Sequence, residues 1–152
     1  GIRGLSNSIS SYWTMQGAQN CGGTAKIYCF GVPPPKNQPK QSILPDLIVE
    51  SIRVSASQVN NATTNLKFEA VIKNIGNGAS TPTQTEFYVP GISTNLVYTG
   101  SMGAGQSVVV ISDWFYGFTI GKGYPVRATA DWPGTVKEMR EDNNVLTTTI
   151  IA

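Results

Sequence analysis

Residues Asn65–Ile75 read NLKFEAVIKNI, and the pattern of this stretch decides the fold class. Every second side chain is apolar, which places one apolar set on a single face of an extended chain: Leu66, Phe68, Ala70 and Ile72. The charged side chains between them fall on the opposite face: Lys67, Glu69 and Lys73. A period of two residues is typical of a β-strand with one face in the core and one in water. The stretch therefore predicts a half-buried strand.

Similar strand signals recur along the sequence from residue 46 onward. Six further stretches are rich in β-branched and aromatic residues: Asp46–Ala56, Thr83–Val89, Asn95–Thr99, Gln106–Phe115, Tyr124–Trp132 and Val145–Ile151. Pairs of Gly, Asn and Pro separate them, as expected of turns. No amphipathic helix is predicted between them. The pattern therefore predicts an all-β fold, an Ig-like antiparallel β-sandwich of about seven strands with an extended N-terminal arm.

The same alternation predicts which side chains form the core. Ten positions are expected to lie largely inside the sandwich: Leu66, Phe68, Ile72, Phe87, Val89, Val109, Val126, Ala128, Val145 and Ile150. Within Gln106–Phe115, the uninterrupted apolar run Val108–Ile111 is expected to form a strand that is buried on both faces. A shift of one residue in any strand would exchange its inner and outer faces.

The distribution of charge divides the chain. Residues 1–45 contain four basic side chains and no Asp or Glu, whereas residues 46–152 contain seven basic and nine acidic ones, a net charge of −2. Prolines cluster before residue 46 and favour an extended, stiff connection. We therefore expect a basic extended arm with a cysteine pair over residues 1–32, a proline-rich linker over residues 33–45 and the β-sandwich over residues 46–152.

Four motifs follow one another in the sandwich region: VIKNIGNGAS at Val71–Ser80, TEFYV at Thr85–Val89, GAGQSVVVISDW at Gly103–Trp114 and ADWPGTVKEMREDNN at Ala130–Asn144. In their order and spacing they resemble the CARDB family, the cell-adhesion-related domain found in bacteria and archaea. The resemblance covers residues 46–152 and none of the arm. It implies an Ig-like extracellular β-sandwich used for surface attachment or assembly, and it implies no chemistry.

The composition argues against an enzyme. The sequence contains no His, which removes the usual near-neutral general base and the Ser-His and Cys-His nucleophile pairs. Glu138 and Asp142 could act as paired carboxylates in glycoside cleavage, but they lie in a turn flanked by Gly and Asn. Solvated turn acids are the simpler interpretation, so no catalytic residue and no cofactor are predicted.

The acids near residue 140 have a second interpretation as oxygen ligands for calcium. Four residues could contribute: Asp131, Glu138, Glu141 and Asp142. Their spacing matches no EF-hand loop, and acidic turns are common without an ion. No metal site is therefore predicted.

Composition also limits the partners and the location. A net charge of +2 is too small to support nucleic-acid binding. No apolar run reaches the length of about 18 residues that spans a bilayer, so no membrane span is expected. Only 13% of the residues are charged, and a surface wetted by hydroxyls and amides suits a secreted protein. We expect an extracellular or cell-surface location after removal of a leader.

Two modification sites follow from this location. Cys21 and Cys29 are the only cysteines and lie close together in sequence, so we expect a disulfide between them within one chain. Disulfides between chains are the alternative. Asn61 begins the only N-x-[ST] sequon, in a turn between the first two predicted strands, and is a possible glycosylation site.

The arm carries the functional prediction. Its apolar side chains are too many to leave in water and too few for an independent core; those expected to act in self-assembly are Ile9, Tyr12, Trp13, Ile27, Tyr28 and Phe30. A basic arm complements the acidic sandwich of another copy, and an extended segment can add to an exposed strand edge. We therefore predict a non-enzymatic subunit of an extracellular filament or pilus, a homopolymer assembled head to tail through the arm, with donor-strand-type β-addition as the candidate mode of contact. The alternative is a cell-surface adhesin or carbohydrate-binding module, excised from a larger secreted protein, with a surface glycan as its partner.

Overall fold

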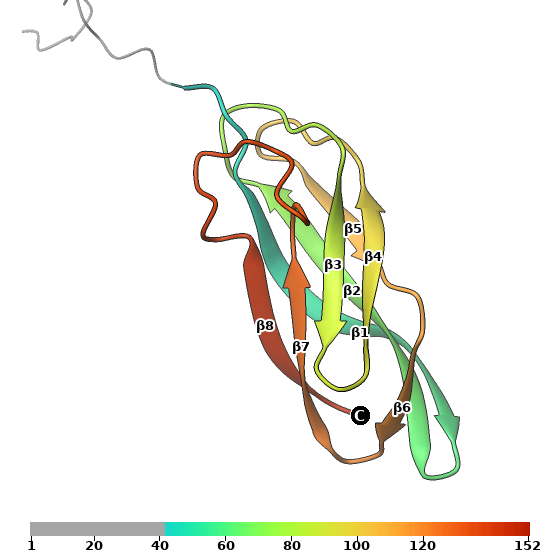
Figure 1. The fold of residues 1–152 in the computed structure, drawn as a ribbon. Coiled ribbons are helices and arrows are strands. Elements are labelled where there is room, and N and C mark those ends of the chain that lie inside the picture. Colours follow the sequence, from blue (N-terminus) through green and yellow to red (C-terminus); the bar gives the residue numbers. More distant parts are fainter. Residues whose placement is uncertain (1–41) are drawn as a thin grey trace, which may run out of the picture. The chain divides into compact units, whose positions relative to one another are not determined.

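The computed structural model of the chain describes residues 42–152, and this part contains no helix and eight strands (Figure 1). The strands are β1 (Leu47–Asn60), β2 (Thr63–Asn74), β3 (Thr83–Val89), β4 (Ser93–Thr99), β5 (Ser107–Ile111), β6 (Phe115–Thr119), β7 (Gly123–Thr129) and β8 (Val145–Ile151). Within the described residues, no helix is long and apolar enough to cross a membrane. The all-β prediction is confirmed.

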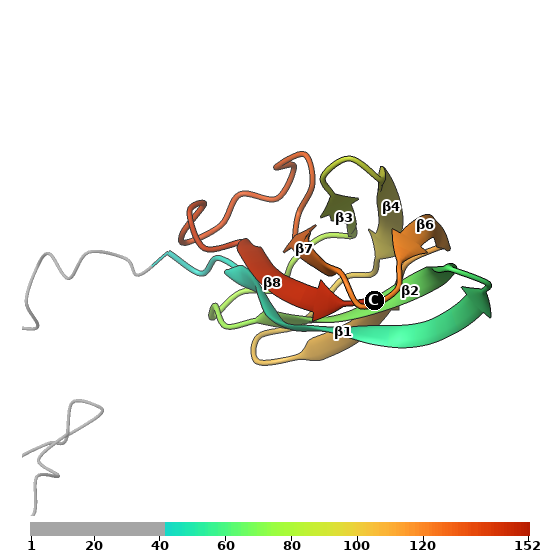
Figure 2. The same cartoon turned by 90° about the horizontal axis from the view of Figure 1, so that it is seen from below.

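The strands form two antiparallel sheets that face each other. One sheet has the order β1-β2-β5, with β6 also paired to β2, and the other has the order β4-β3-β7-β8. Figure 2 shows β1 and β2 in one layer, with β3, β4 and β7 in the other. Strand β2 is long enough for two partners on the same side, because residues 69–73 pair with β5 and residues 63–66 pair with β6. This is the predicted β-sandwich, with one strand more than the seven expected.

The core follows the predicted alternation in the central strands. Of the ten expected core positions, seven are buried: Leu66, Phe68, Ile72, Phe87, Val89, Val126 and Ala128. Phe68 lies at the centre, with its ring centroid 5.2 Å from that of Phe115 and 6.0 Å from that of Phe118, both in edge-to-face geometry. Such aromatic pairs add to the stabilisation that burial alone provides.

The predicted strand over residues 106–115 is wrong in two respects. It is two strands, β5 and β6, and β5 is not buried on both faces, since Val109 is 53% exposed while Val110 is buried. The strand stops because Ser112 takes over the pairing with Phe68, whose backbone N–H donates to the Ser112 Oγ at 2.9 Å. An all-apolar run carries no alternation, so its inward face could not be chosen from sequence.

The prediction for the last strand is wrong at Val145, which is 53% exposed. Val145 and Ile150 are five residues apart, and an odd separation places two side chains on opposite faces of a strand. The inward face of β8 carries Leu146 and Ile150, both half-buried against the core. Strand β8 is an edge of its sheet, which accounts for this incomplete burial.

Candidate functional site: an acidic cap at one end of the sandwich

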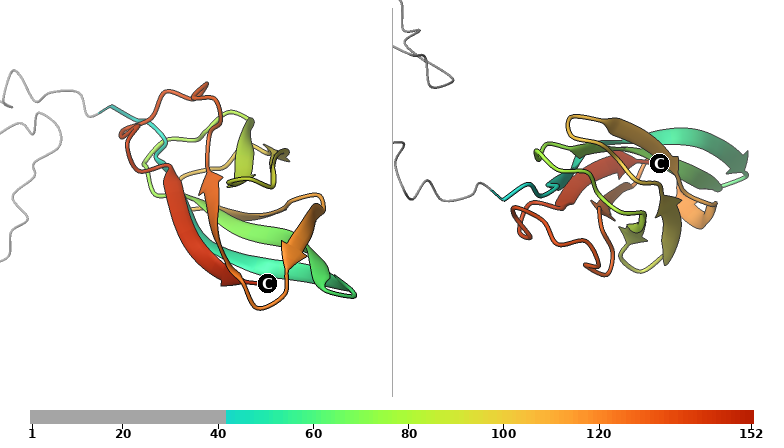
Figure 3. Two further views of the ribbon diagram at one scale, coloured as in Figure 1. Left: turned by 60° about the horizontal axis from the view of Figure 1, so that its bottom comes forward. Right: turned by 90° about the horizontal axis from the view of Figure 1, so that it is seen from above.

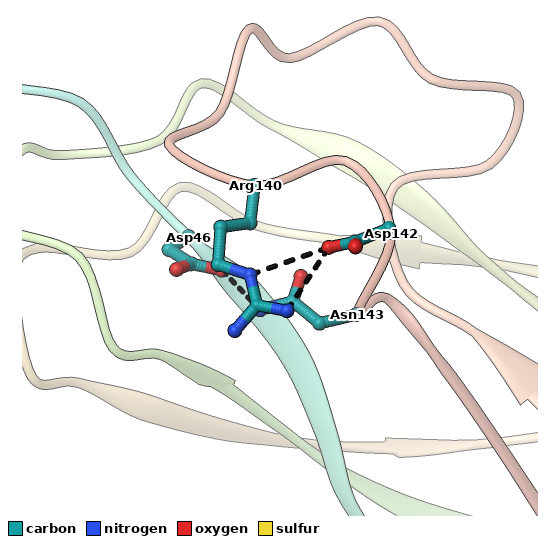
Figure 4. Close-up of polar contacts among 4 residues, drawn as sticks. All are labelled: Asp46, Arg140, Asp142 and Asn143. Atoms are coloured by element: carbon teal, nitrogen blue, oxygen red, sulfur yellow. Dashed lines mark hydrogen bonds and ion pairs between the residues drawn. The ribbon is translucent and has the colours of Figure 1, made fainter.

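The most polar buried part of the domain is a loop that closes one end of the sandwich. We call residues 130–144, between β7 and β8, the cap loop, and residues 42–46, which lead into β1, the lead segment. The two lie side by side at the same end of the sandwich (Figures 1 and 3). The Met139 N–H donates to the Pro45 carbonyl at 2.8 Å, and the Asn143 Nδ2 donates to the Asp46 Oδ1 at 2.7 Å (Figure 4).

Asp131 organises the first half of the cap loop. It is buried and has a positive φ of 49°, a backbone conformation that Asp and Asn tolerate better than most residues. Its carboxylate accepts hydrogen bonds from the Thr135 N–H at 3.2 Å, from the Val136 N–H at 2.9 Å and from the hydroxyl of Thr83 on β3. Hydrogen bonds of this kind to a buried carboxylate hold a turn in one shape.

Glu138 joins the second half of the cap loop to the start of β1. Its side chain is buried; the Oε2 accepts the N–H of Leu47, and the Oε1 accepts the Asn144 Nδ2 at 2.8 Å. The Glu138 N–H in turn donates to the Glu141 Oε1 at 2.9 Å. Burial, together with the nearby charges of Asp131 and Glu141, raises the pKa of Glu138 to about 7 in spite of its hydrogen bonds.

Three carboxylates of the cap loop converge, and we call Asp131, Glu138 and Glu141 the acidic cluster. One oxygen from each lies within 4.8 Å of the other two; Asp131 and Glu138 are buried and Glu141 is exposed. None of the four ion pairs among the described residues includes a member of the cluster. Within residues 42–152, its charge is therefore not neutralised by a Lys or Arg.

The neighbouring Asn144 has an unpartnered oxygen. The residue is 7% exposed, and its Oδ1 accepts no hydrogen bond from the described residues, although its Nδ2 donates to Glu138 in the cluster. Asn143 likewise has a buried Oδ1 without a partner. Buried polar atoms of folded proteins nearly always have a partner, so each of these oxygens needs an explanation.

Asn74 connects the cap to the rest of this end of the domain. Its fully buried side chain accepts the N–H groups of Asp46 and Gly76 and donates to the carbonyl oxygens of Gly78, Met102 and Gly103. These bonds tie together the lead segment, the turn after β2 and the turn before β5. Asn74 is the first asparagine of the VIKNIGNGAS motif.

The structure separates the four acids that the sequence offered as calcium ligands. Asp131, Glu138 and Glu141 come together, whereas Asp142 is exposed and forms an ion pair with Arg140 at 3.2 Å (Figure 4). Asp142 is therefore not a partner of Glu138. Sequence analysis missed Asn144, although the NN pair that ends the fourth motif was visible.

The other predicted site residues have two outcomes. Asn61 lies in the turn between β1 and β2 and is exposed, and its glycosylation stays a prediction. The predicted disulfide and assembly residues lie outside the described residues: Cys21, Cys29, Ile9, Tyr12, Trp13, Ile27, Tyr28 and Phe30.

Glu138 predicts that stability depends on pH in buffer without divalent ions. Its pKa rises from 4.5 to about 7 on folding, so between these values the folded state binds more protons than the unfolded state. The free energy of unfolding should therefore increase as the pH falls from above 7 toward 4.5, and decrease as it rises through 7. Urea unfolding on either side of neutrality tests this against Glu138→Gln, which removes the titration. An unchanged pH slope in that variant would contradict the assignment.

An antiparallel sandwich closed by a hydrogen-bonded acidic loop defines the class of this domain as Ig-like. The sequence profile of the CARDB family matches residues 44–148, and the chain belongs to this family. CARDB is a family of non-catalytic, cell-surface-related domains. The resemblance inferred from the four motifs is thereby confirmed, over the sandwich region alone.

Solved structures agree with this assignment. The crystal structure of a CARDB domain from Pyrococcus furiosus, in complex with di-metal ions, is 27% identical with a TM-score of 0.52, covering 71% of this chain and 88% of that one. A domain from Methanosarcina acetivorans, provisionally named a cell surface protein, is 27% identical with a TM-score of 0.55, covering 72% and 92%. Among curated proteins, none matches the sequence.

Proposed function

We propose that this chain is a non-enzymatic structural module of the cell surface that joins to other copies of itself through residues 1–32. The surface location is supported by the family and by the Methanosarcina acetivorans neighbour. A non-enzymatic role is supported by the use of the buried acids Asp131 and Glu138 in hydrogen bonds that hold the cap loop. The proposal that copies associate with one another depends on the exposed edges of the two sheets.

The observation that favours self-association is an open, uncharged side of the sandwich. Strands β4 and β5 end their sheets, and neither contains a charged residue or a proline. Natural sheets usually protect an edge with one of these features, because unpaired N–H and C=O groups accept a strand from another chain. Side-chain bonds join Asn95 of β4 to Asp113 after β5, but no backbone ladder pairs β4 with β5 in the described part.

The arm has the properties of a strand that could add to such an edge. Residues 24–32 read TAKIYCFGV, an alternating stretch with strand propensity. Residues 1–45 carry a charge of +4 and the remainder −2, so attraction between arm and sandwich favours contact between copies. A contact between two different surfaces repeats in one direction and gives a head-to-tail polymer unless the rotation closes a ring.

Charging the β4 edge should prevent assembly. Leu96 and Tyr98 are 48% and 69% exposed, so Leu96→Lys with Tyr98→Lys places two like charges where the basic arm would pair and leaves the core intact. We expect this variant to sediment as a monomer at concentrations at which the unaltered chain assembles. Gln84→Lys, on the neighbouring central strand β3, is the matched control and should still assemble. Equal assembly of all three proteins would exclude the β4 edge.

The second candidate is an adhesin or carbohydrate-binding module. The observation that favours it is a set of exposed aromatic side chains: Tyr98 at 69%, Tyr116 at 65% and Trp132 at 40%. Aromatic faces can stack on sugar rings. Under this hypothesis the full chain stays monomeric and binds a surface polysaccharide, and replacing these aromatic side chains with Ala weakens that binding.

Two modifications belong to the same extracellular proposal. We propose a Cys21–Cys29 disulfide within one chain and glycosylation at Asn61, after removal of a leader. Mass measurement of the native protein before and after reduction tests the first, since an intrachain disulfide adds two mass units per chain on reduction without releasing a second chain. Enzymatic removal of N-linked glycan tests the second.

The Pyrococcus furiosus domain was solved in complex with di-metal ions, so we asked which residues of this chain are suited to hold a cation. The acidic cluster offers carboxylate oxygens and no sulfur or imidazole, which fits a hard cation such as Ca²⁺. We propose that the cluster is the part of this chain that would hold such an ion.

A further inference from the structure

We propose that Asp131, Glu138, Glu141 and Asn144 bind one calcium-type cation through side-chain oxygens, and that the bound cation fixes the lead segment to the cap loop. This inference rests on the proposed cation-binding role of the acidic cluster and is independent of self-association. It goes further in naming a fourth ligand and a structural consequence for residues 42–46.

Among the described residues, no Lys or Arg compensates the charge of the acidic cluster. Three carboxylate oxygens lie within 4.8 Å of one another, two of the three residues are buried, and no ion pair of the described residues includes them. Like charges at this separation repel strongly when water is excluded. A divalent cation between them would replace that repulsion with attraction.

Asn144 supplies a second observation, which does not depend on charge. Its Oδ1 is buried without a partner, yet the same amide group donates to the Glu138 Oε1 at 2.8 Å. The unpartnered oxygen therefore lies beside the cluster. It is an uncharged amide oxygen, a type of ligand that calcium sites in proteins use. Coordination to a cation would satisfy this oxygen, which has no hydrogen-bond donor in the part of the chain that the structure describes.

The oxygens of the cluster are close enough together for one calcium ion. Calcium lies about 2.4 Å from each oxygen, so two ligands on opposite sides of it are about 4.8 Å apart. The oxygens of the cluster all lie within 4.8 Å of one another, so one calcium ion can contact all three. Calcium binds about six to eight oxygen ligands. Glu141 is exposed, so water molecules can reach the ion and supply the remaining ligands.

The consequence for the lead segment follows from the second oxygen of Glu138. The Glu138 Oε2 accepts the Leu47 N–H at the start of β1, and the adjacent Met139 N–H donates to the Pro45 carbonyl. An ion that holds the Glu138 carboxylate therefore also holds the point at which the preceding chain joins the domain. Removal of the ion should loosen these two hydrogen bonds first.

The test is calorimetric titration of the full chain, freed of ions by a chelator, with Ca²⁺ alone. We expect one site with a Kd of about 10⁻⁴–10⁻³ M, the range of extracellular calcium modules. Glu141→Gln keeps an oxygen that can accept the Glu138 N–H but removes a charge, and should weaken binding about tenfold or more. Asp142→Asn removes an equal charge from the next residue in the chain, outside the cluster, and should leave the Kd within about twofold.

Two further readouts separate the parts of the inference. Tb³⁺ in place of Ca²⁺ should luminesce when Trp132, the neighbour of Asp131, is excited, and Trp132→Phe should abolish this signal. Hydrogen exchange at the Leu47 and Met139 amides should slow on addition of Ca²⁺. Absence of Ca²⁺ heat and Tb³⁺ signal, or equal weakening by Glu141→Gln and Asp142→Asn, would overturn the site. Binding without slower exchange at these amides would overturn the coupling to the lead segment, and neither result depends on whether copies associate.

Discussion

Asn74→Ala is expected to lower the free energy of unfolding by about 4 kcal/mol, because it leaves several buried backbone groups without partners. The Asn74 side chain is fully buried and makes five hydrogen bonds, two as acceptor and three as donor. A methyl group can replace none of them, and water has no access to the site. Urea unfolding followed by Trp fluorescence measures the loss.

Asn77→Ala is the matched control for this prediction. Asn77 lies three residues away in the same turn, and its Oδ1 accepts one exposed hydrogen bond, from the Leu44 N–H at 3.0 Å. Its replacement should cost about 1 kcal/mol or less, since water can take over the bond. Similar costs for the two variants would show that Asn74 is not the connecting residue described above.

Phe68→Ala is expected to cost about 3–5 kcal/mol, the range observed when a large aromatic side chain is removed from a core. Phe68 is completely buried and packs edge to face on both Phe115 and Phe118. The neighbouring strands are held by backbone ladders and cannot collapse fully into the cavity. Thermal and urea unfolding should both show the loss.

Tyr116→Ala separates this core effect from a general effect of removing an aromatic residue. Tyr116 follows Phe115 directly but is 65% exposed, so its removal should change stability by about 0.5 kcal/mol or less. If the Tyr116 variant were as unstable as the Phe68 variant, the inner and outer faces of β6 would be wrongly assigned.

The alternation of apolar and polar residues determines how much of the fold can be predicted. In β2 the alternating charges identify the inward face, and Leu66, Phe68 and Ile72 are all buried. In β5 four successive apolar residues give no such contrast, so Val109 was assigned inward while Val110 is the buried residue. Burial there is decided by the register with β2, in which Val110 pairs with Ala70.

The acidic residues of the cap loop could be identified from the sequence, but which of their side chains converge could not. An irregular loop has no periodicity from which to deduce which side chains converge, so Asp142 could not be separated from Glu141. The bond from the Leu47 N–H to Glu138 joins residues 91 positions apart, and the burial of Glu138 depends on that contact. Only the fold brings the lead segment and the cap loop together.

Sedimentation of the full chain and of a variant lacking residues 1–32 tests whether those residues join copies of this chain. We expect the full chain to form species much larger than its 16.3 kDa monomer, visible as filaments by electron microscopy. The truncated variant should sediment as a single folded monomer, because the core described here lies within residues 42–152. A full chain that remains monomeric at high concentration would contradict the claim and leave the adhesin hypothesis in its place.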